Sequence, residues 1–299
     1  MEPGDPADAA RGVTRVAETN ATDLIGRLGR GTRFDCLVLD LPRYTEETAT
    51  ASLRTRARIV SFGVPLASTF GDVVVNVAEA GDPERSRESV GGASVFRGAE
   101  YVFLRPDVLS ARGRHPFDRH DRRDRERGGA VALAVFGGTD PSALVLEVIE
   151  GIGGSETELL AVCDRRHPAH GEARRLAARH SNVRVESSFR GARNFLARGD
   201  ILITAPGNLL FEGACHGIPL ICFCQNAKQF GDFSRYANVH ERSRVSDVRE
   251  LVAERLSGAR ANDERLHCER VGRGAPWLID TLLNTRTSRR TSQESMTRC

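Results

Sequence analysis

An apolar run, AVALAVF, ends in GGTDPS, whose residues have the right types to hold a phosphate group. Gly137 and Gly138 let a ligand approach the backbone closely. Free N–H groups and the dipole at the start of a following helix favour an anion, and the Thr139 hydroxyl adds a donor. The same stretch also suits a structural role, because Thr139, Asp140 and Pro141 are common at helix N-termini.

A second strand-to-helix junction lies in DILITAPGNLLFEGACHG. Gly207 and Asn208 stand at the junction, and Glu212 follows Asn208 by four residues, so the two polar side chains share one helix face. A carboxylate at this position can accept hydrogen bonds from both hydroxyls of a ribose. The alternative is that Glu212 is a surface residue and Asn208 a helix cap.

A third polar loop, QNAKQ, follows the strand-like PLICFC. Its amides, at Asn226 and Gln229, and the amine of Lys228 can reach a sugar or a phosphate. Three polar loops at the carboxyl ends of neighbouring parallel strands favour a ligand site over three unrelated turns.

These loops need a sheet that brings them to one edge. Apolar runs alternate with amphipathic stretches along the chain, which predicts an α/β protein with a parallel sheet and crossover helices. Strands are expected at 13–17, 34–41, 57–62, 72–76, 98–108, 130–136, 158–164, 182–187, 200–204 and 219–224. Helices are expected at 22–28, 45–56, 142–152, 169–180, 191–198, 207–216, 228–240, 247–256 and 275–283.

Composition changes divide the chain into five parts. Residues 1–11 and 285–299 have no core-forming pattern and are expected to be disordered. Residues 110–129 are almost all charged and predict a solvated linker. The first domain is therefore placed at 12–109 and the second at 130–284.

Composition also excludes several classes of protein. Forty-three basic against 40 acidic residues give a net charge of +3, and acids interrupt the arginine-rich linker, so no nucleic acid is expected as a partner. No apolar run is long enough for a membrane span, and the first residues do not resemble a secretory signal. Seven scattered cysteines without a CxxC pair indicate buried thiols in a reducing cytoplasm, and no metal or cofactor is expected.

The motifs together resemble a known family. FGGTDP, GDILITAPGNLLFEGACHGIPLICF and NAKQ are similar to the C-terminal domain of GT-B nucleotide-sugar enzymes of the glycosyltransferase 28 group. Within it, the chain most resembles the UDP-sugar hydrolases of pseudaminic-acid biosynthesis and their spore-coat polysaccharide relatives. DCLVLDL, DVVVN, GAEYVFLRPDV and GRGAPWLIDTLL resemble further segments of that family, so the resemblance covers about residues 34–284.

The resemblance implies a GT-B-like α/β fold of two Rossmann-type domains with parallel sheets, the first one reduced. It implies a UDP-sugar partner held mainly by the second domain, in surface-polysaccharide or nonulosonic-acid biosynthesis. Glu212 would hold the ribose and Phe189 would flank the uracil. The diphosphate side would be lined by Gly137, Gly138, Thr139, Gly207 and Asn208, and the sugar by Asn226 and Gln229.

The sequence departs from the family pattern at the catalytic loop. Family members begin with a GxGHxxR loop whose histidine activates water, and this sequence has no such loop. Asp40 and His216 are the candidates for a catalytic acid or base. Three interpretations stay open: a UDP-sugar hydrolase, a glycosyltransferase with a sugar acceptor, or a nucleotide-sugar-binding protein that lacks the chemistry or relies on a second subunit for the loop. A purely structural role for the glycine loops is the remaining alternative.

Overall fold

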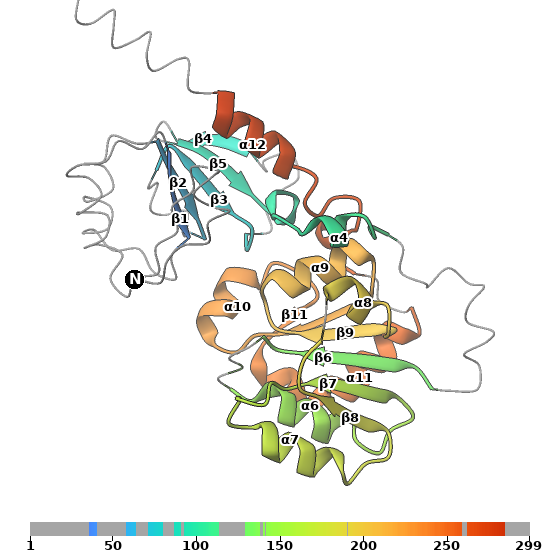
Figure 1. Cartoon of the computed structure of the whole chain (residues 1–299). Coiled ribbons are helices and arrows are strands. Elements are labelled where there is room, and N and C mark those ends of the chain that lie inside the picture. The colour runs from blue at the N-terminus through green and yellow to red at the C-terminus, as the bar shows by residue number, and fades with distance from the viewer. Residues whose placement is uncertain are drawn as a thin grey trace, which may run out of the picture. The chain divides into compact units, whose positions relative to one another are not determined.

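The computed structural model divides into two units, each built on a β-sheet (Figure 1). One unit contains the described residues up to Asn76 together with Arg87–Phe96, and the other contains Val77 onward apart from that insertion. The structure describes residues 36–40, 58–63, 71–79, 87–90, 93–113, 129–137, 140, 142–189, 191–258 and 262–284.

The first unit is a five-stranded sheet. Its strands are β1 (Cys36–Asp40), β2 (Arg58–Phe62), β3 (Val73–Asn76), β4 (Arg87–Val90) and β5 (Ala93–Arg97), in the spatial order β1-β2-β3-β5-β4. β1, β2 and β3 are parallel, as predicted. The antiparallel pair β4–β5 was not predicted and extends the sheet beyond β3.

The second unit is built on a six-stranded parallel sheet. Its strands are β6 (Val131–Val135), β7 (Glu158–Val162), β8 (Val183–Glu186), β9 (Ile201–Thr204), β10 (Leu220–Phe223) and β11 (Val239–His240). The spatial order β8-β7-β6-β9-β10-β11 corresponds to 3-2-1-4-5-6, the order of a Rossmann sheet. The strand order therefore reverses between β6 and β9, which is the point where such sheets hold ligands.

Helices cover both faces of this sheet. The described helices of the second unit are η2 (Ala99–Tyr101), α4 (Pro106–Leu109), α6 (Leu144–Ile152), α7 (His170–Ala177), α8 (Ala192–Leu196), α9 (Asn208–His216), α10 (Ala227–Phe233), η3 (Arg242–Asp247), α11 (Val248–Leu256), η4 (Glu264–Leu266) and α12 (Ala275–Asn284). Figure 1 shows α8 and α9 on one face of the sheet, and α6 and α7 on the other.

Alternation along each strand separates two apolar cores. In β6, Ala132 and Ala134 pack with α6, α7 and α11, whereas Leu133 and Val135 pack with α8 and α9. Helix α9 lies close to the sheet, because a Cβ on Gly213 would be 2.7 Å from Leu202 Cδ2. Both faces of the sheet are thus buried, as the continuous apolar strands predict.

Two predicted elements were wrong. The expected strand at 98–108 is the turn η2, an extended stretch and the short helix α4, which begins at Pro106 because proline suits the first helical position. The expected helix at 228–240 ends at Phe233 in α10, and Val239–His240 then pair with β10 as β11.

Residues 97–109, which the sequence pattern assigns to the first domain, and residues 110–113, which it assigns to the linker, belong to the second unit. The predicted elements at 13–17, 22–28 and 45–56, most of the linker and the tail lie outside the described residues. Among the residues that the structure does describe, no helix is long and apolar enough to span a bilayer.

Candidate ligand-binding site

Strand register brings the predicted loops of the second unit to one edge of its sheet. Val135 of β6 pairs with Thr204 of β9, which pairs with Cys222 of β10; on the other side Val135 pairs with Val162 of β7, which pairs with Glu186 of β8. Each predicted loop begins two or three residues beyond this row. With about 4.8 Å between strands, the ends of β6 and β9 are neighbours, and the end of β8 lies about 10 Å from that of β6.

Side chains fix the loops at the switch point. The buried Thr204 hydroxyl donates to the Val135 carbonyl at 2.7 Å and ties β9 to β6. The Gln225 side chain, from the end of β10, donates to the Phe136 carbonyl at 3.0 Å. Ser142, at the start of α6, donates to the Gln225 carbonyl at 3.2 Å. The loops after β6 and β10 are therefore joined across the end of β9.

The β6–α6 junction is closed by an acid. The buried Asp140 carboxylate accepts hydrogen bonds from the backbone N–H groups of Leu144 and Val145, both at 3.1 Å, and the Asp140 carbonyl accepts from Ala143. The helix N-terminus that was predicted to hold a phosphate thus has its first donors occupied by its own chain. Gly137 has a φ of 82°, which gives it a conformational reason to be glycine. Gly138, Thr139 and Pro141 lie outside the described residues.

Two basic groups surround Asp140. His167 Nε2 lies 3.2 Å from the Asp140 carbonyl and donates to it, because His167 Nδ1 accepts from the Ala169 amide. Burial raises the pKa of Asp140, and the amide bonds from Val145 and Leu144, together with the nearby His167 and Arg242, offset part of that rise. The β6–α6 junction is therefore a compact polar network whose own groups satisfy one another.

The β9–α9 junction is open. No side chain caps α9, its first turn carries no acid, and the Leu210 N–H bonds to the Gly207 carbonyl. The backbone N–H groups of Asn208 and Leu209 have no hydrogen-bond partner in the described part of the chain. No atom of the described residues lies within 4 Å of the place where a Gly207 Cβ would be. Two donors and a helix dipole at the switch point therefore have no acceptor among the described residues.

Glu212 lies one turn behind this open end, on the same helix face as the exposed Asn208. Its side chain is only 12% exposed, and Oε1 is 3.2 Å from Nε of Arg105. Burial raises the pKa of Glu212; Arg105 offsets part of the rise, and Asp107 adds to it. No pattern in the sequence pairs Arg105 with Glu212, because only the packing of α4 on α9 brings them together.

The remaining predicted residues lie at the same edge. Phe189, just beyond β8, stacks on Phe195 with ring centroids 4.5 Å apart. Asn226 caps α10 by accepting from the Gln229 N–H at 3.0 Å, and Gln229 Oε1 accepts from the Gln225 N–H at 2.8 Å. The oxygens of both amides are thus occupied locally, and their amide nitrogens are the groups that can meet a ligand.

Neither catalytic candidate belongs to the carboxyl edge of the second sheet. Asp40 is the last, exposed residue of β1 in the first unit. His216 is buried at the C-terminal end of α9, about 12 Å along the helix from Asn208. Since α9 runs back from the carboxyl edge, His216 lies toward the opposite edge of the sheet. Among the described residues, no three His, Cys, Asp or Glu side chains gather as a metal site requires.

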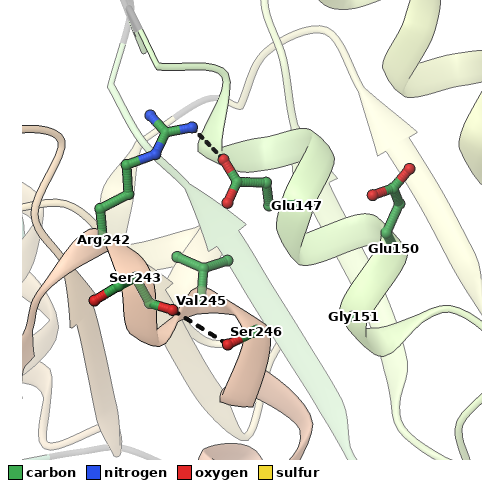
Figure 2. Close-up of a pocket in the computed structure, with 7 residues that line it drawn as sticks. All are labelled: Glu147, Glu150, Gly151, Arg242, Ser243, Val245 and Ser246. Atoms are coloured by element: carbon green, nitrogen blue, oxygen red, sulfur yellow. Dashed lines mark hydrogen bonds and ion pairs between the residues drawn. The ribbon is translucent and has the colours of Figure 1, made fainter.

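A hollow of about 630 Å³ lies between α6 and η3 (Figure 2). Glu147 forms an ion pair with Arg242 at its side, and Ser246 donates to the Ser243 carbonyl at 3.2 Å. Glu150 and Gly151 also line it. None of the predicted ligand residues contributes to this hollow, so it is separate from the carboxyl-edge site.

Comparisons with known proteins define the fold. A MurG structure from Acinetobacter baumannii matches with a TM-score of 0.52 at 13% identity, and the match covers 88% of this chain and 76% of the MurG chain. Anabaena Alr3699/HepE in complex with UDP matches with a TM-score of 0.50 at 12% identity, and the match covers 88% of this chain and 81% of the Alr3699/HepE chain. The chain has a GT-B-like fold. The predicted fold class is therefore confirmed, with two Rossmann-like units.

Comparison of sequences gives one distant curated relative. No family model matches the chain. The uncharacterized protein MJ1062 of Methanocaldococcus jannaschii is 21% identical over 238 residues, which are 77% of this chain and 46% of that protein. This chain thus spans less than half the length of the curated relative that it matches.

Proposed function

We propose that the second unit binds the nucleotide of a UDP-sugar, and that the protein acts at the anomeric carbon of that sugar. The observation that carries the proposal is the open N-terminus of α9 at the switch point, with Glu212 one turn behind it. The likeness to a structure in complex with UDP supports this choice of nucleotide.

The diphosphate is assigned to the β9–α9 junction. There, Gly207 permits close approach, and the N–H groups of Asn208 and Leu209 donate to phosphate oxygens. Gly137 lies on the neighbouring strand end, and we assign Gly138 and Thr139 to the same side of the ligand. The closed β6–α6 junction makes α9, rather than α6, the main source of helix N–H donors in this proposal.

The other contacts follow the order of the strands. Glu212 accepts hydrogen bonds from the ribose hydroxyls, and the segment at Phe189 flanks the uracil. On the opposite side of α9, the amide nitrogens of Asn226 and Gln229 donate to sugar hydroxyls.

The proposed reaction is displacement of UDP by water. The bond between the anomeric carbon and the diphosphate oxygen breaks, UDP leaves with the electron pair, and a water oxygen bonds to the carbon while a base takes its proton. The donors at α9 stabilise the charge that develops on the leaving diphosphate. Asp40 is the proposed base, and an acceptor hydroxyl in place of water would make the same site a glycosyltransferase.

Calorimetry with UDP tests the binding half of the proposal. We expect one site, with affinity about tenfold to a hundredfold lower in Glu212→Gln because bonds to a charged acceptor are lost. Gln at position 212 keeps the size of the side chain, and Glu172→Gln, an exposed acid of α7, is the matched control. Equal affinities in the wild type and Glu212→Gln would overturn the assignment of the ribose.

The only lysine gives an independent readout. Lys228 lies exposed in the first turn of α10, next to the proposed sugar contacts. UDP-sugar should slow acylation of Lys228, measured by mass spectrometry of its peptide, more than UDP does. Equal acylation with and without either ligand would contradict the placement of the sugar at α10.

Incubation with a panel of UDP-sugars tests the chemistry. Release of UDP and free sugar supports a hydrolase, and release only with an added acceptor supports a transferase. Asp40→Asn should lower the rate of release without weakening UDP binding. Tight UDP binding without release from any sugar would reject both reactions.

A further inference from the structure

The carboxylate assigned to the ribose is held by an ion pair that crosses two segments of the second unit. Arg105 Nε lies 3.2 Å from Glu212 Oε1 and 3.8 Å from Asp107 Oδ1. The Arg105 and Asp107 side chains are about half exposed, whereas that of Glu212 is nearly buried. One guanidinium therefore stands between two carboxylates with different access to water.

Few charges act on Glu212. Arg105 and Asp107 of the α4 segment shift its pKa, and Cys215 on its own helix is a thiol whose pKa is raised by burial and which stays neutral. The other helices packed on α9 carry Arg193 on α8, and Glu264 and Arg265 on η4, and none of these shifts it. The adjoining strands β9 and β10 carry no acidic or basic side chain, and burial raises the pKa of the Cys222 thiol so that it stays neutral.

We propose that Arg105 is a positioning residue for the ribose site, and that Asp107 competes with Glu212 for its guanidinium. The contact through Oε1 leaves Oε2 of Glu212 to accept from a ribose hydroxyl, and the positive charge keeps the carboxylate ionised. An ionised carboxylate accepts from two hydroxyls, whereas a protonated one uses an oxygen as a donor. This inference rests on the proposed function, because it assigns a role around the same acid.

Opposite pH shifts are the signature of this arrangement. Without Arg105, the carboxylate gains a proton at a higher pH, and ribose binding weakens earlier as pH falls. Without the charge of Asp107, Arg105 is left to Glu212, the Glu212 pKa falls, and binding persists to lower pH. A merely structural role for Arg105 predicts no such pair of shifts.

The test is calorimetry with UDP from pH 5 to 8 on the full chain. Arg105→Gln should weaken binding about tenfold at neutral pH and move the pH of half-maximal affinity upward. Asp107→Asn should move it downward, and Arg105→Lys should restore most of the affinity. Because Glu212→Gln has no carboxylate at this position, its profile shows how protonation of UDP alone changes the affinity with pH. Arg193→Gln, which removes an exposed arginine of α8, is the matched control for Arg105→Gln.

The outcomes separate the two proposals. Absent UDP binding by the wild type, or unchanged binding by Glu212→Gln, rejects the proposed function and this inference with it. UDP binding that depends on Glu212 but not on Arg105, with superimposable pH profiles, rejects the role of Arg105 alone. Should Arg105→Gln not fold, an unshifted Asp107→Asn profile overturns the inference.

Discussion

The two strand-to-helix junctions at the switch point are built from similar sequence and end in different states. At β6–α6, Asp140 turns back and occupies the first N–H groups of the helix. At β9–α9, Gly207 carries no side chain and the first N–H groups stay open. A glycine followed by a polar residue therefore does not identify an anion site. The helix N–H groups are available to an anion only where no carboxylate of the same chain already accepts from them.

Adding a capping acid to the β9–α9 junction, as Asp140 caps the β6–α6 junction, should have the largest effect on UDP affinity. Gly207→Asp introduces a cap where a Cβ would contact no described residue, at a backbone conformation that any residue adopts. We expect UDP affinity to fall about a hundredfold, because a carboxylate occupies the donors and repels the diphosphate. The unfolding free energy should rise by about a few tenths of a kcal/mol.

Gly207→Asn is the matched variant for that experiment. It also caps the helix but adds no charge, so it should weaken UDP binding less than Gly207→Asp does. Calorimetry gives the affinities, and urea unfolding followed by Trp277, the single tryptophan, gives the stability of the second unit. Equal UDP affinity in Gly207→Asp and the wild type would remove the diphosphate from α9.

Opening the closed junction should cost stability rather than binding. Asp140→Ala leaves the N–H groups of Leu144 and Val145 without their acceptor, and we expect a loss of about 1–2 kcal/mol in unfolding free energy. Glu150→Ala, an exposed acid of the same helix, is the control and should change stability by less than about 0.5 kcal/mol. A large loss of UDP binding in a folded Asp140→Ala protein would show that the β6 junction carries the ligand after all.

The bridge between the junctions should contribute less. Gln225→Ala removes the hydrogen bond to the Phe136 carbonyl, which we expect to lower the unfolding free energy by about 1 kcal/mol. The exposed Lys228→Ala, in the same region, should change it by less than half of that. Equal urea midpoints for the two variants would mean that Gln225 does not hold the loops together.

The smallest effect is the pH dependence of the closed junction. The pKa of Asp140 is raised above 3.8, so the folded state favours its protonated form. The stabilisation that the folded state gains from protonating Asp140 is fully present below pH 3.8, and it is lost as pH rises through the folded-state pKa. The stability of the wild type relative to Asp140→Asn should therefore decrease over that interval in urea unfolding. A difference that stays constant with pH would contradict the raised pKa.

Much of this architecture was predictable. The apolar runs located β1, β2 and β3 and the first five strands of the second unit, because strands of parallel sheets are rich in aliphatic residues. The β4–β5 hairpin carried a signal that was not used, since two glycines, Gly91 and Gly92, separate its strands. β11 could not be predicted, because a two-residue strand has no periodicity and exists only through its pairing with β10.

The candidate site divides in the same way. Asn208 and Glu212 were placed on one helix face, and Gly207 at the start of the helix, from spacing alone, and the helix lies where the spacing predicts. Strand register then put their loop beside Gly137 and Asn226, as expected for parallel strands. The roles of these residues toward a ligand remain predictions.

The sequence by itself determined the elements and the edge where polar loops meet, because periodicity and strand direction are local properties. Only the tertiary structure decided which helix N-terminus is open and which acid is paired. Asp140 caps α6 through a fold of the intervening loop, and Arg105 meets Glu212 because α4 packs on α9. Such contacts form only when segments far apart in the sequence pack against the same sheet, and the spacing of residues along the chain does not predict them.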